Sequence, residues 1–170
     1  EDVVEEYTND PIRVAGVGAA SERVGLFQRD TYTAISSSKN AAESAYEAAG
    51  IEPGDLDFAE VHDCFAIAEL LAYEDLGFCE KGAGGEFVEG GTLQAPDGEL
   101  PFNTDGGGLC NNHPANRGGM PKIIETVRQL RGEANDPVQV PDCEIGLTHG
   151  TGGSLGTRMA STTLVLGGDR

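Results

Sequence analysis

The sequence predicts an α/β fold in which a mixed sheet of about five strands has helices packed on it. In residues 11–76, segments typical of strands alternate with segments typical of helices, which favours parallel neighbouring strands. Near the end of the chain, two apolar segments rich in β-branched residues flank a run of glycines at 150–156. Two strands joined across so short a connection most simply lie antiparallel to each other.

The first half of the chain supplies two strand-helix pairs. Residues 11–19 alternate apolar and small side chains like a short strand, and residues 33–49 show helical spacing that ends at Gly50. Residues 57–61 then alternate like a strand with one buried face. Residues 65–76 return to helical spacing, and the apolar side of this expected helix carries Phe65, Ala68, Leu71 and Ala72.

Glycine dominates residues 77–108 and leaves no room there for a long helix. A loop region of this length is usually functional or mobile. A helix is expected from Pro121, which fits a first helical turn, to Gly132, and strands are expected at 144–148 and 159–166. We expect residues 11–170 to form one domain, and residues 1–10 to be a disordered segment or the boundary of a longer chain, since they lack an initiator Met.

The charge balance is strongly acidic, with 29 Asp and Glu against 11 Lys and Arg and a net charge of −18. Nucleic-acid binding is disfavoured, because phosphate neutralisation needs clustered basic residues. Lys39, Lys81 and Lys122 are the lysines of the chain. Acidic, lysine-poor surfaces suit a high-salt cytoplasm, where screening removes self-repulsion. The composition therefore predicts a halophilic source, most simply an archaeon, and the lack of a long apolar run predicts no membrane span.

Chemistry is expected around residues 60–65 (EVHDCF), which lie between an expected strand and an expected helix. In open α/β sheets, ligands bind outside the carboxyl ends of strands. His62 and Cys64 lie in this block, and His113 and His149 lie in glycine-rich or strand-end segments. Two interpretations stay open from the residues alone: thiol chemistry assisted by imidazole, and a Cys/His metal site. The spacing favours thiol chemistry, because the chain has no close pairs of metal ligands such as CxxC.

Four blocks of the sequence together resemble the C-terminal half of a thiolase of the sterol-carrier-protein type. Residues 60–65 resemble the HDCF block of that subfamily, and residues 101–108 (PFNTDGGG) resemble the PxNxxGG approach to the family's GHP motif. Residues 112–114 (NHP) occupy the place of GHP, and residues 147–153 (LTHGTGG) lie where other thiolases have CxG. The blocks occur in the family's order and spacing over roughly residues 11–167.

The resemblance implies a catalytic role for four residues of this chain. His113 would be the base that activates a nucleophilic Cys carried by the N-terminal half, and no part of this chain matches that Cys. Cys64 would move a proton to or from the substrate α-carbon, and His62 would help to hold the enolate oxygen. His149 and the glycines after it would flank the oxyanion of the acyl-enzyme. The substrate implied is a coenzyme A thioester, with no bound cofactor, no metal and no residues assignable to coenzyme A.

One departure from the family motif keeps other functions open. Where the family reads GHPxGATG, residues 112–119 read NHPANRGG, with Asn116 and Arg117 adding polar bulk to a small-residue turn. Alternatives to acyl transfer by a thiolase are therefore a thiolase-fold aldolase or condensing enzyme acting on β-hydroxyacyl-CoA, and a non-catalytic half-domain that binds acyl-CoA or lipid. The resemblance also implies an N-terminal half as partner, a homo-oligomer when full length and a small zinc-containing OB-fold companion. The four cysteines show neither CxxC spacing nor the pattern of a small disulfide scaffold, which favours a reducing cytoplasm as the location.

Overall fold

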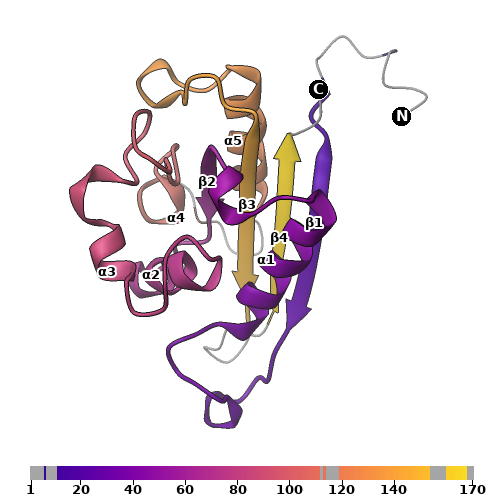
Figure 1. Cartoon of the computed structure of the whole chain (residues 1–170), viewed down its shortest axis with the longest axis vertical. Helices are drawn as coiled ribbons and strands as arrows, with labels where there is room; N and C mark the ends of the chain where they lie inside the picture. The colour runs from indigo at the N-terminus through magenta and orange to yellow at the C-terminus, as the bar shows by residue number, and fades with distance from the viewer. Residues whose placement is uncertain (1–5, 7–10, 112, 114–118, 154–159, 168–170) are drawn as a thin grey trace.

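The fold is organised around one mixed sheet (Figure 1). The computed structural model describes residues 6, 11–111, 113, 119–153 and 160–167. Within them the strand order is β1 (Val14–Ser21), β4 (Ala160–Gly167), β3 (Ile145–Gly152) and β2 (Phe58–Val61). β1 and β3 both pair antiparallel with β4, and β2 pairs parallel with β3, so the predicted mixed sheet is confirmed.

The expected number of about five strands is wrong by one for the described residues. The edge beside β2 carries a single parallel bridge between Ala59 and Phe102 instead of a fifth strand. Ala59 N–H donates to Pro101 O at 3.0 Å, and Asn103 N–H donates to Ala59 O at 2.9 Å. Asn103 then takes a φ of 48° and turns the chain away, so the pairing ends before a strand can form.

Three longer helices pack on or beside the sheet: α1 (Ser36–Ala49), α2 (Ala66–Asp75) and α5 (Gly119–Arg131). The glycine-rich region contains only short turns of helix, as expected. The short helical pieces are α3 (Gly84–Phe87), α4 (Gly107–Cys110), and the 3₁₀ turns η2 (Leu26–Gln28), η3 (Pro53–Asp55), η4 (Glu89–Gly91) and η5 (Asp136–Val138).

Helix α1 lies against β1 and β4, and α5 lies on the opposite side, against β3 and β2 (Figure 1). Gly16 and Gly18 allow the close approach of α1, because a Cβ at either position would collide with the carbonyl oxygens of Ala45 and Ala41. The core between α1 and the sheet is small and apolar, and it continues toward α2. Its members include Ala42, Ala45, Tyr46, Val61, Ala72, Leu76, Leu147 and Val165.

Helix α5 is oriented with its polar side toward the sheet. Lys122, Glu125, Thr126 and Gln129 are its buried residues, whereas Met120 is 58 % exposed and Ile124 is 45 % exposed. Met120 and Ile124 therefore lie on a side of α5 that faces away from the sheet.

Two further expectations concern disorder in residues 1–10 and the lack of a membrane span. Apart from Glu6, residues 1–10 lie outside the described residues, and so do residues 112, 114–118 and 154–159, which hold the altered motif and the end of the second glycine run. Among the described helices, none combines the length and the apolar character that crossing a membrane requires.

Candidate active site

The candidate site begins where β2 ends. β2 stops at Val61, and α2 starts at Ala66 after Phe65, which is extended at φ −143° and ψ 139°. His62, Asp63 and Cys64 therefore form the turn between strand and helix, as the sequence predicts. Phe65 differs from the expectation: it precedes the helix and is one of the large exposed apolar side chains, so it does not join Ala68 and Ala72 in the core.

Three of the four predicted residues come together at this turn. The ring Nε2 atoms of His62 and His113 are 3.2 Å apart, and the two rings meet edge to face with centroids 4.9 Å apart. One ligating atom from each of His62, Cys64 and His113 lies within 4.8 Å of the other two. His62 is 9 % exposed, Cys64 is half-buried and His113 is exposed, so the cluster opens to the surface through His113.

His149 does not join this cluster. Its ring is buried and its Nε2 atom lies 3.0 Å from Ser38 Oγ of α1. β3 continues to Gly152, so His149 lies inside a strand, and its side chain points to the face that α1 covers. Its backbone still touches the site, because His149 O accepts a hydrogen bond from His62 N–H at 3.1 Å.

Asp63 links the two segments that carry the cluster. Its Oδ1 atom accepts the Gly108 N–H at 2.6 Å, and its Oδ2 atom accepts the Leu109 N–H at 3.3 Å. These bonds hold α4, which leads directly to His113, against the turn that carries His62 and Cys64. Gly107 and Gly108 make the contact possible, because a Cβ on either would collide with the Asp63 carboxylate.

A buried lysine lies beneath this link. Lys122 Nζ donates to Asp63 Oδ1 at 3.3 Å and to Asn103 Oδ1 at 3.2 Å, and Lys122 is 4 % exposed. Asn103 Oδ1 also accepts the Val61 N–H at 2.7 Å. A buried ammonium is tolerated when it is paired and hydrogen-bonded, and here its partners fix the end of β2. Lys122 and Asp63 were not among the predicted site residues.

A second polar group lies between β2 and α5. Glu60 is fully buried, and its Oε1 atom accepts both the N–H and the hydroxyl of Thr104 at 2.8 Å. The Thr104 hydroxyl also lies 3.1 Å from Glu125 Oε1, and Gln129 Nε2 donates to Thr104 Oγ1 at 2.9 Å. Desolvation by burial raises the pKa of Glu60 from 4.5 to about 8, against the lowering effect of the Thr104 hydrogen bonds. Glu60 is therefore neutral at pH 7.

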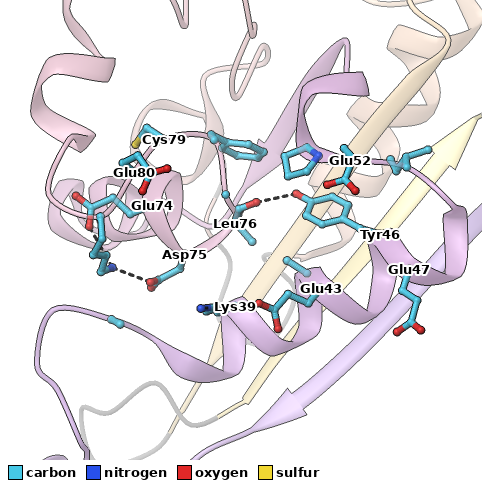
Figure 2. A pocket seen from close by; sticks show the side chains of 17 residues that line it. Lys39, Glu43, Tyr46, Glu47, Glu52, Glu74, Asp75, Leu76, Cys79 and Glu80 are labelled. Carbon is cyan, nitrogen blue, oxygen red and sulfur yellow. Dashed lines mark hydrogen bonds and ion pairs between the residues drawn. The ribbon is translucent and has the colours of Figure 1, made fainter.

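An open hollow of about 1000 Å³ lies elsewhere, between α1, η3 and the end of α2 (Figure 2). Figure 2 shows two of its lining residues joined by a hydrogen bond, in which the Tyr46 hydroxyl donates to Leu76 O with 3.0 Å between the oxygens. Its charged lining is mostly carboxylate, with Asp75 and Glu74 bound by Lys81 at 2.7 and 3.1 Å. None of the clustered residues lines this hollow, and its acidic walls would repel the phosphates of an anionic substrate.

Comparison with known proteins shows the family of this chain. A family model described as thiolase C-terminal domain-like matches residues 18–168. The chain belongs to the thiolase family and corresponds to the C-terminal domain of its members. Within that family, the HDCF-type block at 60–65 agrees with similarity to relatives of the sterol-carrier-protein type.

Two curated relatives and one solved structure illustrate the similarity. An acetyl-CoA acetyltransferase of Methanothermobacter thermautotrophicus is 45 % identical over 156 residues, covering 92 % of this chain and 40 % of that protein. Sterol carrier protein 2 of Bos taurus is 41 % identical over 120 residues, covering 69 % of this chain and 22 % of that protein. An Ltp2-ChsH2(DUF35) aldolase superposes with a TM-score of 0.79 at 31 % identity, covering 94 % of this chain and 40 % of the aldolase chain.

Proposed function

We propose that this chain is the C-terminal catalytic half of an acyl-CoA thiolase, which transfers acyl groups by Claisen condensation or by thiolysis of a β-ketoacyl-CoA. The observation that carries the proposal is the convergence of His62, Cys64 and His113 at the carboxyl end of β2. The similarity to acetyl-CoA acetyltransferases supports the kind of reaction.

The proposed chemistry divides two proton transfers among the three residues. His113 takes the thiol proton of a nucleophilic Cys on the N-terminal half, so that its sulfur can attack the thioester carbonyl and release the thiol of coenzyme A. Cys64 as thiolate removes the α-proton of the second acyl-CoA, and the resulting enolate attacks the acyl-enzyme. His62 donates a hydrogen bond to the enolate oxygen, where negative charge develops.

The protonation states of His62 and His113 are coupled in this scheme. At 3.2 Å between Nε2 atoms, one ring donates its N–H to the lone pair of the other. The tautomer of one ring therefore sets the tautomer of the other. His149 acts on the site through its backbone, because its carbonyl oxygen fixes the N–H of His62.

The N-terminal half is proposed as the unit that covers α5. The chain spans 40 % of the acetyl-CoA acetyltransferase that it matches, and the sequence contains no counterpart of the nucleophilic Cys block. Met120 and Ile124 stay exposed on α5 while the polar side of that helix is buried. Docking of a second α/β unit would bury this face and bring its nucleophile toward the carboxyl end of β2. A cytoplasmic location remains our expectation.

Aldol cleavage of a β-hydroxyacyl-CoA is the second candidate function. The solved structure of the Ltp2-ChsH2(DUF35) aldolase favours it, since that protein is named an aldolase, its name includes DUF35, and it shares the fold at 31 % identity. The sequence also motivates this candidate, because Asn116 and Arg117 stand in place of the small residues of the thiolase motif, and a change to polar residues in a motif is compatible with a change of substrate. A small zinc-containing OB-fold companion is proposed as partner for this reaction.

The test compares two reactions in the protein assembled with its nucleophile-bearing half. Thiolysis of a β-ketoacyl-CoA and cleavage of a β-hydroxyacyl-CoA are measured side by side, together with exchange of the α-proton of acyl-CoA into deuterated water. Cys64→Ala is expected to abolish α-proton exchange while acylation of the nucleophile persists. Cys79→Ala is the matched control, because Cys79 is also half-buried and lines the acidic hollow instead. Exchange that survives Cys64→Ala removes Cys64 from the mechanism.

A further inference from the structure

The clustered side chains have the spacing of a metal site. A tetrahedral Zn²⁺ holds histidine nitrogens at about 2.0–2.1 Å and a cysteine sulfur at about 2.3 Å, which places two nitrogens about 3.3 Å apart and a nitrogen and a sulfur about 3.5 Å apart. The Nε2 atoms of His62 and His113 are already 3.2 Å apart. Cys64 Sγ lies within 4.8 Å of a ring nitrogen of each histidine, so a shift of the sulfur by no more than about 1.3 Å would reach the roughly 3.5 Å that tetrahedral binding requires.

The donor set favours one class of cation. Two imidazole nitrogens and one thiolate suit borderline-soft ions such as Zn²⁺, whereas Mg²⁺ and Ca²⁺ require oxygen ligands. Asp63 is the carboxylate next to the cluster, and its two oxygens already accept hydrogen bonds from Gly108 N–H, Leu109 N–H and Lys122. The cluster therefore offers nitrogen and sulfur ligands and no carboxylate oxygen. Its choice of cation should differ from that of the acidic surface of the chain, whose carboxylates offer only oxygen ligands.

We propose that His62, Cys64 and His113 bind a divalent cation of the zinc class through their Nε2, Sγ and Nε2 atoms. Cys64 binds as the thiolate and releases its proton to the solvent, and the two neutral rings keep their protons on Nδ1. The exposed position of His113 leaves the fourth coordination position open to water or to an incoming thiol. On the proposed function, on which this consequence alone rests, the cation would occupy the lone pairs that proton transfer needs and would inhibit the reaction.

The test uses Zn²⁺ and Co²⁺ alone, added to chelator-treated protein without substrate and in the presence of excess Mg²⁺ to saturate surface carboxylates. The expected result is one tightly bound Zn²⁺ by calorimetry, and one Co²⁺ whose spectrum shows a sulfur-to-cobalt charge-transfer band and tetrahedral d–d intensity. Cys64→Ser and His113→Gln should each weaken Zn²⁺ binding by more than about 10–100-fold, since even outer partners of a metal site contribute that much.

Cys110→Ser is the control, because Cys110 is an exposed thiol outside the cluster and should be replaceable without effect. His113 is exposed, so His113→Gln removes one ligand without disturbing the packing of the hydrophobic core. The proposal is overturned if Cys64→Ser binds Zn²⁺ as tightly as the unaltered protein, if the cobalt spectrum lacks the thiolate band, or if Cys110→Ser removes the binding. No acyl-CoA enters the binding measurement, so its result does not depend on whether the proposed reaction occurs. A failure to bind Zn²⁺ would likewise not count against the proposed reaction.

Discussion

The buried carboxyl of Glu60 gives a prediction about pH and stability that can be worked out from the structure. Burial raises the Glu60 pKa from 4.5 to about 8, so between these values the folded protein holds a proton that the unfolded chain has released. The stabilising effect of the neutral form is therefore complete below about pH 4.5 and is lost as the pH rises toward about 8. A difference of about 3.5 pKa units corresponds to roughly 5 kcal/mol as an upper value.

Glu60→Gln replaces the titratable carboxyl group by an amide of nearly the same size and shape. The amide oxygen can still accept the N–H and hydroxyl of Thr104, as Glu60 Oε1 does at 2.8 Å. Glu60 Oε2 has no hydrogen-bond partner among the described residues, so the new amide N–H groups would carry a cost of about 1–3 kcal/mol that does not depend on pH. The unaltered protein should be the more stable one near pH 5, and it should lose up to about 5 kcal/mol relative to the variant by pH 8 to 9.

Urea unfolding followed by circular dichroism at constant salt, between about pH 5 and pH 9, measures this difference. A further variant sharpens the test: Thr104→Val removes the hydroxyl whose hydrogen bond lowers the Glu60 pKa, so its stability should fall over a window that extends to higher pH. Profiles of unaltered protein and Glu60→Gln that run parallel across the whole range would refute the assignment of a neutral Glu60.

Three more predictions follow from other parts of the fold. Lys122→Met should lower the free energy of urea unfolding by about 3 kcal/mol, because it leaves the buried Asp63 carboxylate with two backbone donors and no charge partner among the described residues. The double variant Lys122→Met with Asp63→Asn should recover part of this loss, and an equal loss in the single and double variants would contradict the pairing of Lys122 with Asp63. Ile124→Ser should leave unfolding of this chain within about 1 kcal/mol but weaken its association with the nucleophile-bearing half in sedimentation, and unchanged association would exclude α5 from that interface. Because the chain has a net charge of −18, its unfolding free energy should rise from low to molar KCl, and equal stability at both would count against a halophilic protein.

Local sequence patterns predict where the site lies along the chain better than they predict which residues contact one another there. The turn from β2 to α2 is foreseeable, because alternation ends and helical spacing begins within a few residues around Cys64. Each strand of the sheet is also visible in the sequence, from alternation in residues 11–19 and 57–61 and from apolar, β-branched side chains in residues 144–148 and 159–166. The order β1-β4-β3-β2 is not visible, because it depends on contacts between segments far apart in the chain.

The position of His149 shows how a boundary error changes an expected role. A strand that ends at residue 148 would place His149 in a loop, where functional side chains gather. β3 instead continues to Gly152, since residues 149–152 pair with Thr163 through Ala160 of β4. Inside a strand the direction of a side chain is set by alternation, and His149 is thereby turned to Ser38 on α1.

The polar layer under the site could not be read from helical periodicity. Spacing of apolar residues on α5 predicts which side is apolar, and for an isolated domain that side would face the sheet. The reverse occurs here: Lys122, Glu125 and Gln129 face inward, where hydrogen bonds to Asp63, Thr104 and Asn103 satisfy them. The proposed N-terminal half would cover the exposed apolar side chains of α5, which the sheet of this chain does not cover.

Asp63 explains how two histidines 51 positions apart in the chain reach each other. Asp63 lies between His62 and Cys64, and nothing in the sequence assigns it a role of its own. In the structure its carboxylate accepts hydrogen bonds from the N–H groups of Gly108 and Leu109 and from the ammonium group of Lys122. These contacts hold the segment that ends in His113 against the end of β2. A carboxylate with three donors is fixed in direction, so Asp63 holds α4 at the turn where the Nε2 atoms of His62 and His113 lie 3.2 Å apart. The same contact requires glycine at 107 and 108, which accounts for the glycine run that the sequence shows before His113.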